Sequence, residues 1–283
     1  MSDWLVSTDW LAAHLGDRDL VVLDCSWYLP EAGKQAIDDF RREHIPGARF
    51  IDLAAVSDPN SPYVNMLPAA SLWSMQVGRL GIDNDTTVVI YDAGYVSARL
   101  WWMFRVFGHD KVRILDGGWR KWKAEGRPSE SGDPAPARPA KFKAELREGR
   151  VAQLADVLRA VEQGGTTIVD ARTAARFDGT EGSGYPGVPS GHMPRAINTP
   201  WQRFFAPDFT FVDPAAAAKV FKDAGADIGG AVIATCGSGV TAAILGFMIE
   251  RAGNPAWRLY DGSWHEWGQR KDTPKLTAAR KDS

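Results

Sequence analysis

The stretch VIATCGSGVTAAILG, Val232–Gly246, decides the fold of this chain. Its first residues form a short apolar run of the kind found in buried parallel strands, and Ala242–Arg251 has the pattern of a helix. A glycine-rich loop, Cys236–Thr241, joins the two. Ligands of open α/β sheets bind beyond the carboxyl ends of the strands, so this loop is where we predict a functional site.

The chain carries an earlier copy of the same pattern. VVIYDAGYVSARLWW, Val88–Trp102, matches the stretch above at an offset of 144 residues. His44 in EHIPGA and His192 in SGHMPRA are 148 residues apart, and Arg113 in RILDGGW and Arg258 in RLYDGSW are 145 apart. Nearly constant offsets over blocks in the same order indicate one internal duplication, and each copy is long enough to form a domain.

The duplication predicts a first domain over 1–133, a linker over 134–148 and a second domain over 149–283. The linker prediction follows from RPSESGDPAPARPAKFK, which collects Pro and charge without the period of a strand or helix. Within each copy, short apolar runs alternate with helical patterns. The fold class is therefore α/β, with two similar domains that each contain a parallel sheet covered by helices on both faces.

Composition excludes several function classes. The 283 residues include 33 Lys and Arg against 35 Asp and Glu, for a net charge of −2. No basic run is present, so neither nucleic acid nor an anionic membrane is expected as a partner. The start, MSDWLVSTDW, has no signal-peptide core, and no apolar stretch is long enough to span a bilayer. These features predict a cytoplasmic protein.

The cysteine count points to a free thiol. Cys25 and Cys236 are the only cysteines, and the five histidines form no CxxC or HExxH pattern. This predicts neither a disulfide framework nor a metal site. Cys25 has no glycine loop after it and is interpreted as a buried bystander.

Cys236 stands at the corner between strand and helix. Gly237 and Gly239 allow the backbone to turn tightly, so that several N–H groups point toward one position. The helix N-terminus adds partial positive charge there, which favours a thiolate and can hold the outer sulfur of a persulfide. The alternative is a buried structural cysteine, because a free cysteine packs like a small hydrophobic residue.

The first copy has a different residue at this position. Aligned without gaps, Asp92 stands where Cys236 stands in the second copy. A carboxylate cannot carry transferable sulfur, so the first domain is predicted to be catalytically inactive and to support or cover the second. One active site per chain follows.

These residues together resemble the rhodanese superfamily in its tandem two-domain form. The resemblance runs over nearly the whole chain and includes HIPGA (His44–Ala48), SPYVNMLP (Ser61–Pro68) and CGSGVTA (Cys236–Ala242). It implies a sulfurtransferase in which Cys236 attacks a small anionic sulfur donor and becomes a persulfide. A thiol acceptor, such as thioredoxin or a low-molecular-weight thiol, or cyanide then removes the outer sulfur. The resemblance implies no cofactor.

The loop also resembles one group within the family. In 3-mercaptopyruvate sulfurtransferases the catalytic cysteine is followed by Gly, a hydroxyl residue, Gly, Val and Thr, whereas thiosulfate sulfurtransferases place basic residues there. This chain has Gly237, Ser238, Gly239, Val240 and Thr241. The resemblance therefore implies 3-mercaptopyruvate as the preferred donor over thiosulfate.

Other site residues also come from the resemblance. Arg176 matches the arginine that holds the donor's anionic group, which a guanidinium can pair with bidentately. Tyr185 stands where mercaptopyruvate enzymes commonly have a second arginine, and its phenol can donate one hydrogen bond. Ser238 is a candidate to polarise or protonate the donor, and His44 is a candidate to reach the site from the first domain. A histidine repeated in both copies, as His44 and His192 are, is also typical of a structural turn.

Two other functions remain as alternatives. A cysteine-dependent phosphatase or arsenate reductase of related fold needs an arginine six residues after the cysteine, where this chain has Ala242. A non-catalytic binding module would suit the first copy, which lacks the cysteine, better than the second.

Overall fold

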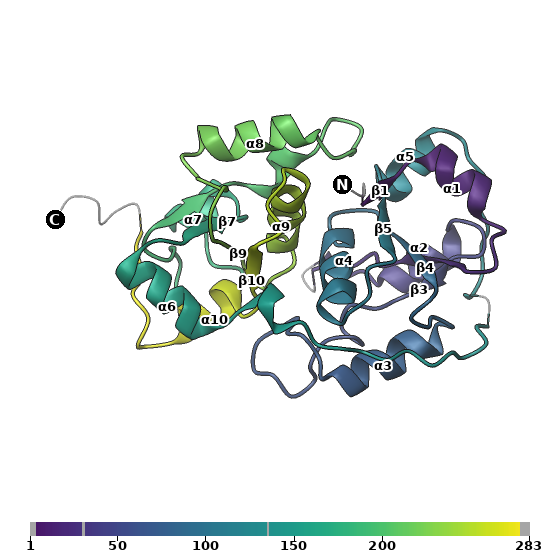
Figure 1. Cartoon of the computed structure of the whole chain (residues 1–283), viewed down its shortest axis with the longest axis horizontal. Coiled ribbons are helices and arrows are strands. Elements are labelled where there is room, and N and C mark those ends of the chain that lie inside the picture. The colour runs from purple at the N-terminus through teal and green to yellow at the C-terminus, as the bar shows by residue number, and fades with distance from the viewer. Residues whose placement is uncertain (1–3, 30–31, 135, 278–283) are drawn as a thin grey trace. The chain divides into compact units, whose positions relative to one another are not determined.

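The computed structural model describes residues 4–29, 32–134 and 136–277 (Figure 1). The chain forms two compact units. Unit 1 comprises Met1–Pro59, Leu67–Arg147 and Ala206–Phe211, and unit 2 comprises Asn60–Met66, Glu148–Phe205 and Val212–Ser283. Each unit thus contains one short segment from the other half of the chain. Positions 1–3, 30–31 and 278–283 of the predicted domains and 135 of the predicted linker lie outside the described residues.

Unit 1 is built on a five-stranded parallel sheet of order β1-β5-β4-β2-β3. Its strands are β1 (Leu5–Val6), β2 (Leu20–Asp24), β3 (Arg49–Phe50), β4 (Thr87–Tyr91) and β5 (Val112–Leu115). Its helices are α1 (Thr8–His14), α2 (Ala36–Arg42), α3 (Ala70–Arg79), α4 (Ser97–Val106) and α5 (Gly118–Ala124).

Unit 2 repeats this topology, with a parallel sheet of order β6-β10-β9-β7-β8. Its strands are β6 (Val151–Ala152), β7 (Thr167–Asp170), β8 (Ala196–Asn198), β9 (Val232–Thr235) and β10 (Trp257–Tyr260). Its helices are α6 (Leu154–Gln163), α7 (Ala174–Asp178), α8 (Pro214–Asp223), α9 (Ala242–Arg251) and α10 (Ser263–Gln269), with 3₁₀ turns η2 (Glu148–Arg150) and η3 (Trp201–Phe204).

Helices cover both faces of the second sheet. Ile168 of β7 and Ile233 of β9 share one buried cluster with α6 and α10, including Trp264. Their neighbours along the strands, such as Val169, are also fully buried but point to the opposite face, where α9 contacts β9 and β10. Strands buried on both sides explain the continuous apolar runs in the sequence. The predicted α/β fold in two similar copies is confirmed.

Ala206–Phe211, the segment of unit 1 that comes from the second half of the chain, is held by specific contacts. The Phe211 N–H donates to Asp116 Oδ1 over 2.8 Å, and the Arg120 guanidinium lies 3.8 Å from the ring centroid of Phe209. A hydrogen bond and a cation–π contact therefore fix Ala206–Phe211 within this unit.

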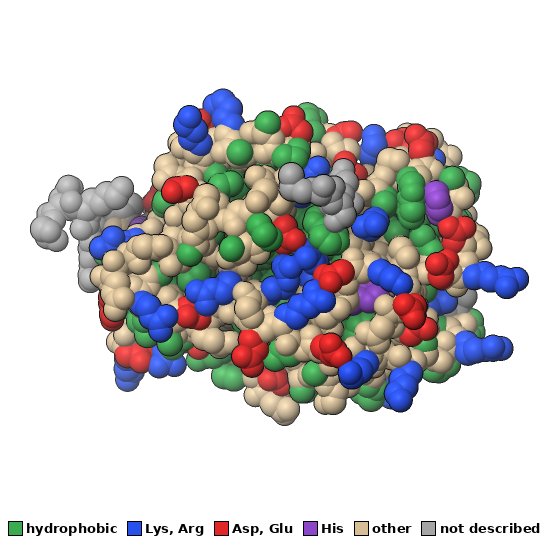
Figure 2. Space-filling view, viewed as in Figure 1, with side chains coloured by type: hydrophobic (Ala, Val, Ile, Leu, Met, Phe, Trp, Pro, Cys, Tyr) green, Lys and Arg blue, Asp and Glu red, His purple; other side chains and the backbone are tan. Residues whose placement is uncertain are grey.

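Two further structural observations concern membrane and metal. None of the helices in the described ranges combines the length and hydrophobicity that crossing a bilayer requires. The same residues contain no cluster of three or more His, Cys, Asp or Glu side chains arranged to hold a metal ion. On the face shown in Figure 2, acidic and basic side chains are intermixed.

Candidate active site

Cys236 follows the last residue of β9 directly and begins the loop that leads to α9. Two backbone bonds tie this loop to the start of α10: the Trp264 N–H donates to the Cys236 carbonyl over 3.0 Å, and the His265 N–H donates to Gly237 over 2.9 Å. Cys236 is 2% exposed. The residue is therefore almost fully enclosed by its neighbours.

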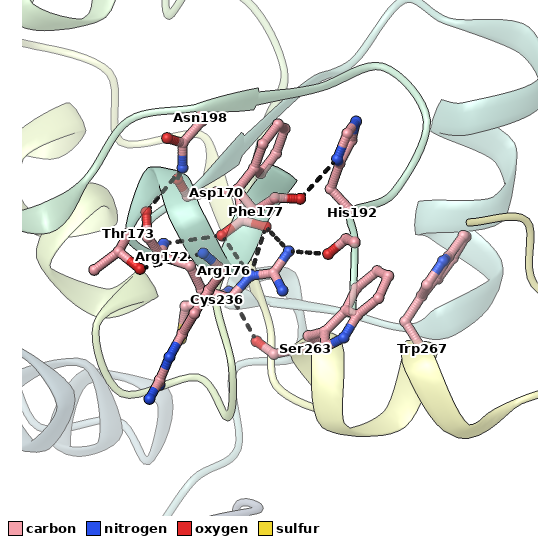
Figure 3. A network of polar contacts seen from close by, with 12 residues as sticks. Asp170, Arg172, Thr173, Arg176, Phe177, His192, Asn198, Cys236, Ser263 and Trp267 are labelled. Atoms are coloured by element: carbon pink, nitrogen blue, oxygen red, sulfur yellow. Dashed lines mark hydrogen bonds and ion pairs between the residues drawn. The ribbon is translucent and has the colours of Figure 1, made fainter. Parts of the chain in front are cut away.

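The side chain of Ser263 holds the loop in place through hydrogen bonds. Its hydroxyl accepts the N–H groups of Cys236 (3.2 Å) and Gly239 (3.1 Å) and donates to the Tyr260 carbonyl (2.9 Å). Figure 3 shows this hydroxyl facing Cys236. Ser263 has φ 48°, a left-handed conformation that costs free energy for any residue with a Cβ. The fold thus keeps a strained serine where it gathers two amides of the loop.

Other amides of the loop remain available. Among the described residues, no protein group accepts the N–H groups of Gly237, Ser238, Val240 or Thr241. Thr241 is also the N-cap of α9, a helix of ten residues. Free N–H groups at a helix N-terminus attract an anion, so the loop is suited to hold one negatively charged atom.

The equivalent loop of unit 1 holds an anion of its own. The Asp92 carboxylate accepts the N–H of Val96 over 2.8 Å, the N–H of Ser97 over 2.5 Å, and the N–H of Gly94 and hydroxyl of Ser97. Val96 and Ser97 correspond in sequence to Val240 and Thr241. The amides that bind a carboxylate in one copy are thus open in the other.

Ser238 lies beside a segment from the first half of the chain. The side-chain amide of Asn65 donates to Ser238 Oγ over 3.1 Å, and Ser238 is buried. Asn65 belongs to Asn60–Met66, which is part of unit 2. The predicted residue Ser238 therefore has a polar partner that the sequence reasoning did not identify.

Tyr185 covers Gly237. A Cβ on Gly237 would lie 2.6 Å from the Tyr185 hydroxyl oxygen, so the phenol fills the space of a side chain at that position. Burial raises the pKa of Tyr185 to about 12, and the nearby polar side chain of Ser238 acts in the opposite direction. The phenol is therefore protonated at neutral pH and able to donate a hydrogen bond.

His265 connects these pieces. Its ring stacks on Tyr185 with centroids 4.4 Å apart, and its Nδ1 accepts the Val64 N–H over 3.1 Å. The ring of Tyr63 meets it edge-on at 5.9 Å. Burial lowers the pKa of His265, which favours the neutral ring that this acceptor role requires. His265 thus anchors both Tyr185 and Asn60–Met66 beside the loop.

Arg176 projects from α7 and is partly accessible. Its side chain is 35% exposed, and its Nε lies 3.3 Å from Glu181 Oε1. The guanidinium packs against Gly184, and its charge lowers the pKa of Tyr185 slightly against the dominant effect of burial. Arg176 and Tyr185 therefore lie near one another, and Arg176 forms an ion pair with Glu181.

Arg172 has a different environment. It is buried, pairs with Asp170 through Nη2 at 2.7 Å and Nε at 3.0 Å, and donates to the Gly191 carbonyl at 2.9 Å (Figure 3). Its guanidinium also lies 4.6 Å from the ring centroid of Trp264. These contacts join β7, the loop before β8 and α10, which is a structural role.

The repeated histidines occupy equivalent positions in their own units. His44 stacks on Phe40 at 3.8 Å, and its ring nitrogens contact the Phe40 carbonyl and Glu130. His192 stacks on Phe177 at 3.9 Å, and its Nδ1 contacts the Phe177 carbonyl. All these contacts of His44 lie within unit 1.

Cys25 is fully buried, and its thiol donates to the Tyr91 carbonyl over 3.3 Å. Burial, reinforced by the charges of Asp92 and Asp24, raises its pKa well above the usual range. This thiol is unreactive as a nucleophile, because nucleophilicity requires the thiolate.

The model of the Rhodanese-like domain matches residues 7–125 and 153–270. The chain belongs to the rhodanese family. Both copies of the duplication match, including the copy with Asp92. The relatives that match nearly the full length of the chain are sulfurtransferases, and the chain is a sulfurtransferase of the same family. This activity takes the place of the two alternatives, the phosphatase and the non-catalytic binding module.

Full-length relatives carry two names. The chain is 40% identical to human 3-mercaptopyruvate sulfurtransferase over 274 residues, covering 94% of this chain and 92% of that protein. It is 39% identical to rat thiosulfate sulfurtransferase over 275 residues, covering 94% and 92%. Among solved structures, SseA from Escherichia coli, a 3-mercaptopyruvate sulfotransferase, has a TM-score of 0.86 at 32% identity and covers 93% of this chain and 99% of that one.

Three residues of this rhodanese site were missed in the sequence. Ser263 lies in the repeated DG-x-W block, whose other copy has Gly118 at the matching position. This difference between the two copies could have marked Ser263 as a residue specific to the second domain's site. Asn65 and His265 gave no such signal, because their partners are distant in sequence and their side-chain types are common on surfaces.

Proposed function

We propose that Cys236 is the nucleophile of this sulfurtransferase and carries the sulfur as a persulfide. The observation that supports this is the difference between the two loops. The N–H groups of Val240 and Thr241 have no protein acceptor among the described residues, whereas their counterparts in unit 1 bind the Asp92 carboxylate. A thiolate or persulfide anion at Cys236 would receive the stabilisation that Asp92 receives.

The proposed reaction has two balanced steps. The Cys236 thiolate attacks the sulfur of 3-mercaptopyruvate, so that an S–S bond forms and the C–S bond breaks. The electron pair of the broken bond leaves on the enolate of pyruvate, which takes up one proton. An acceptor thiolate, such as that of thioredoxin or a low-molecular-weight thiol, or cyanide then attacks the outer sulfur and releases the Cys236 thiolate.

We propose 3-mercaptopyruvate as the preferred donor over thiosulfate. The donor's single carboxylate suits one guanidinium, that of Arg176, together with one phenol donor, that of Tyr185. The thiosulfate dianion would gain from basic side chains on the loop itself, but Gly237 and Ser238 carry no charge. Tyr185 also fills the space beside Gly237 that a longer side chain would need.

Comparing the two donors tests this proposal. We expect kcat/KM for 3-mercaptopyruvate to exceed that for thiosulfate by at least about tenfold, because one further charged hydrogen bond is worth about 1.5–3 kcal/mol. Equal values, or a preference for thiosulfate, would contradict the proposed donor. The persulfide itself is read as a mass gain of about 32 Da on the intact chain.

Replacing Arg176 tests the proposed anion site. Arg176→Ala should weaken transition-state binding of the donor by roughly 2–4 kcal/mol, chiefly through KM, because a guanidinium–carboxylate pair is lost. Glu181→Gln is the matched control: it removes the present partner of Arg176, so KM should stay the same or fall. An Arg176→Ala variant with unchanged kinetics would place the anion elsewhere.

A further inference from the structure

We infer that Glu181 is a specificity-determining residue whose carboxylate, paired with Arg176, disfavours sulfur donors that carry two negative charges. The inference rests on the proposed function, in which Arg176 binds the anionic group of the donor, and it deepens that function. Both residues belong to unit 2: Arg176 lies on α7, and Glu181 lies in the loop that follows this helix.

The backbone of Glu181 is fixed against α7. Gly179, with φ 83°, is the C-cap of the helix and lets the chain turn back in a left-handed conformation. The Glu181 N–H then donates to the Ala175 carbonyl over 3.0 Å, and the Thr180 hydroxyl donates to the same carbonyl over 3.2 Å. These bonds hold Glu181 beside Arg176, one turn of helix away from its own place in the sequence.

The guanidinium of Arg176 uses only one of its three nitrogens in this ion pair. Its Nε donates to Glu181 Oε1 over 3.3 Å. Its Nη1 and Nη2 lie against Gly184, where a Cβ would approach them to 3.1 and 3.4 Å, and neither has an acceptor among the described residues. An anionic group can therefore bind Nη1 and Nη2 while Glu181 keeps Nε, so that the two negative groups share one guanidinium.

This sharing makes the site sensitive to the charge of the donor. Glu181 offsets the single positive charge of Arg176, and the other groups proposed to contact the donor, the phenol of Tyr185 and the loop residues Gly237 and Ser238, bring no charge. The repulsion from Glu181 acts once on 3-mercaptopyruvate, which has one carboxylate, and twice on the thiosulfate dianion. Glu181 therefore contributes to the preference for the donor with one negative charge.

The size of this effect follows from exposure. The side chains of Arg176 and Glu181 are 35% and 52% exposed, so water screens the repulsion and each unit of donor charge is expected to change the affinity only about threefold. For the same reason dissolved salt should weaken the effect further, because the Debye length falls from about 20 Å at low ionic strength to about 4 Å at 0.5 M.

Glu181→Gln tests the role of the charge. The variant has nearly the same shape, and its amide oxygen can still accept from Arg176 Nε. At an ionic strength of about 20 mM, kcat/KM should rise about threefold for 3-mercaptopyruvate and about tenfold for thiosulfate, chiefly through KM. At about 0.5 M both gains should shrink to less than about twofold. A structural role of Glu181 would depend neither on the charge of the donor nor on salt.

Asp178→Asn is the matched control. It removes one carboxylate from the same helix, two positions after Arg176, where side chains do not face each other. The ratio of the two kcat/KM values should therefore change by about 1.5-fold or less. Thermal melts of both variants should match the wild type, since exposed carboxylates of this kind contribute little to stability.

Contrary outcomes separate this inference from the proposed function. Gains in Glu181→Gln that are absent, equal for both donors, or unchanged at high salt would overturn the role of Glu181. Arg176→Ala is measured in the same assays: if it loses activity as proposed while Glu181→Gln leaves the donor ratio unchanged, only the inference about Glu181 is wrong. If Arg176→Ala has no effect, the proposed anion site is wrong and the inference is overturned with it.

Discussion

The Asp92 and Cys236 loops are two versions of one strand-to-helix corner. Both begin at the end of the corresponding strand, and in each the next helix but one donates a backbone N–H to the carbonyl of the first loop residue, from Trp119 (2.9 Å) or Trp264 (3.0 Å). In the first loop the carboxylate of Asp92 is bound by the loop's own donors. In the second loop, the corresponding N–H groups of Val240 and Thr241 have no protein acceptor among the described residues.

The difference shows that the backbone N–H groups of the corner are able to bind an anion in both copies. The first loop residue, Asp92 or Cys236, determines which anion they bind. The Asp92 carboxylate, held by donors of its own loop, fills the corner permanently. A thiol places one polarisable atom there, which can gain and lose a second sulfur. Under the proposed function, the duplication thus separates a corner that stabilises its helix from a corner that performs chemistry, within one chain.

Converting the second corner into the first should have the largest effect. Cys236→Asp should lower sulfur transfer by a factor on the order of 10³ or more, since the nucleophile is absent. The variant should still fold, because the open amides of Val240 and Thr241 can bind the new carboxylate as their counterparts bind Asp92. Intact mass after incubation with a donor and a thermal melt check both statements.

Cys25→Ser is the control for this variant. It removes the other thiol, which is buried and bonded to a carbonyl, and should leave the mass gain at Cys236 intact. A Cys236→Asp protein that still gained one sulfur would show that the persulfide forms elsewhere.

The strands beside β4 and β9 differ between the copies in their last residues, Asp24 of β2 and Asp170 of β7, which predicts opposite effects of one substitution. Asp170 pairs with the buried Arg172, so Asp170→Asn leaves a buried guanidinium without its counter-charge and should destabilise the protein by about 3–5 kcal/mol. Among the residues that the structure describes, no arginine pairs with Asp24, and burial raises its pKa to about 6 from an ordinary 3.8. Asp24→Asn should therefore stabilise the protein at neutral pH.

The sign of the Asp24 effect depends on pH. Between about pH 4 and 6 the folded state binds more protons at Asp24 than the unfolded state, so wild-type stability falls as pH rises through this range. The gain from Asp24→Asn should approach about 3 kcal/mol above pH 6 and vanish below pH 4. Urea titrations at pH 4 and 7.5 measure it, and an equal difference at both values would refute the role of the charge.

Removing the carboxylate from the first corner should have a somewhat smaller effect. Asp92→Ala leaves the buried donors of Val96 and Ser97 without an acceptor and should lower the free energy of unfolding by about 3 kcal/mol. Asp92→Asn retains one acceptor oxygen and should cost less, about 1 kcal/mol. If both variants were as stable as wild type, the carboxylate would not stabilise the corner.

Much of the fold could be predicted because the central elements are long and regular. The apolar runs before Asp92 and Cys236 are central strands β4 and β9, and the predicted helix Ala242–Arg251 has the bounds of α9. The edge strands were not predicted, since β1, β3 and β6 contain only two residues and carry no period. Their pairing depends on tertiary contacts, which a local pattern does not contain.

The site was predictable only where the chemistry is local. Cys236, its glycines and the following helix are contiguous, so their relation could be read from spacing. The contact between Asn65 and Ser238 spans 173 positions. It depends on Asn60–Met66 joining the unit of the other half, which no sequence pattern indicated. The contacts of His44 with Phe40 and Glu130, in contrast, lie within one unit and leave the predicted role of His44 untested.

Ser263 offers the finest test of the comparison, because the first corner has Gly118 at this position. Ser263→Gly removes the acceptor for the N–H groups of Cys236 and Gly239 but relieves the strain of φ 48°. We expect little net change in the free energy of unfolding and a loss of about tenfold in kcat/KM. The lost hydrogen bonds are worth about 1 kcal/mol, and without them the N–H groups of the loop are no longer held in alignment.

Ser263→Ala separates the two contributions. It removes the same hydroxyl but retains a Cβ at the left-handed φ, so it should lose the same activity as Ser263→Gly and also about 1 kcal/mol of stability. Measuring kcat/KM and the urea midpoint for both variants decides the point. If Ser263→Gly kept full activity, the hydroxyl would not align the loop, and the first corner would lack activity solely because Asp92 replaces the cysteine.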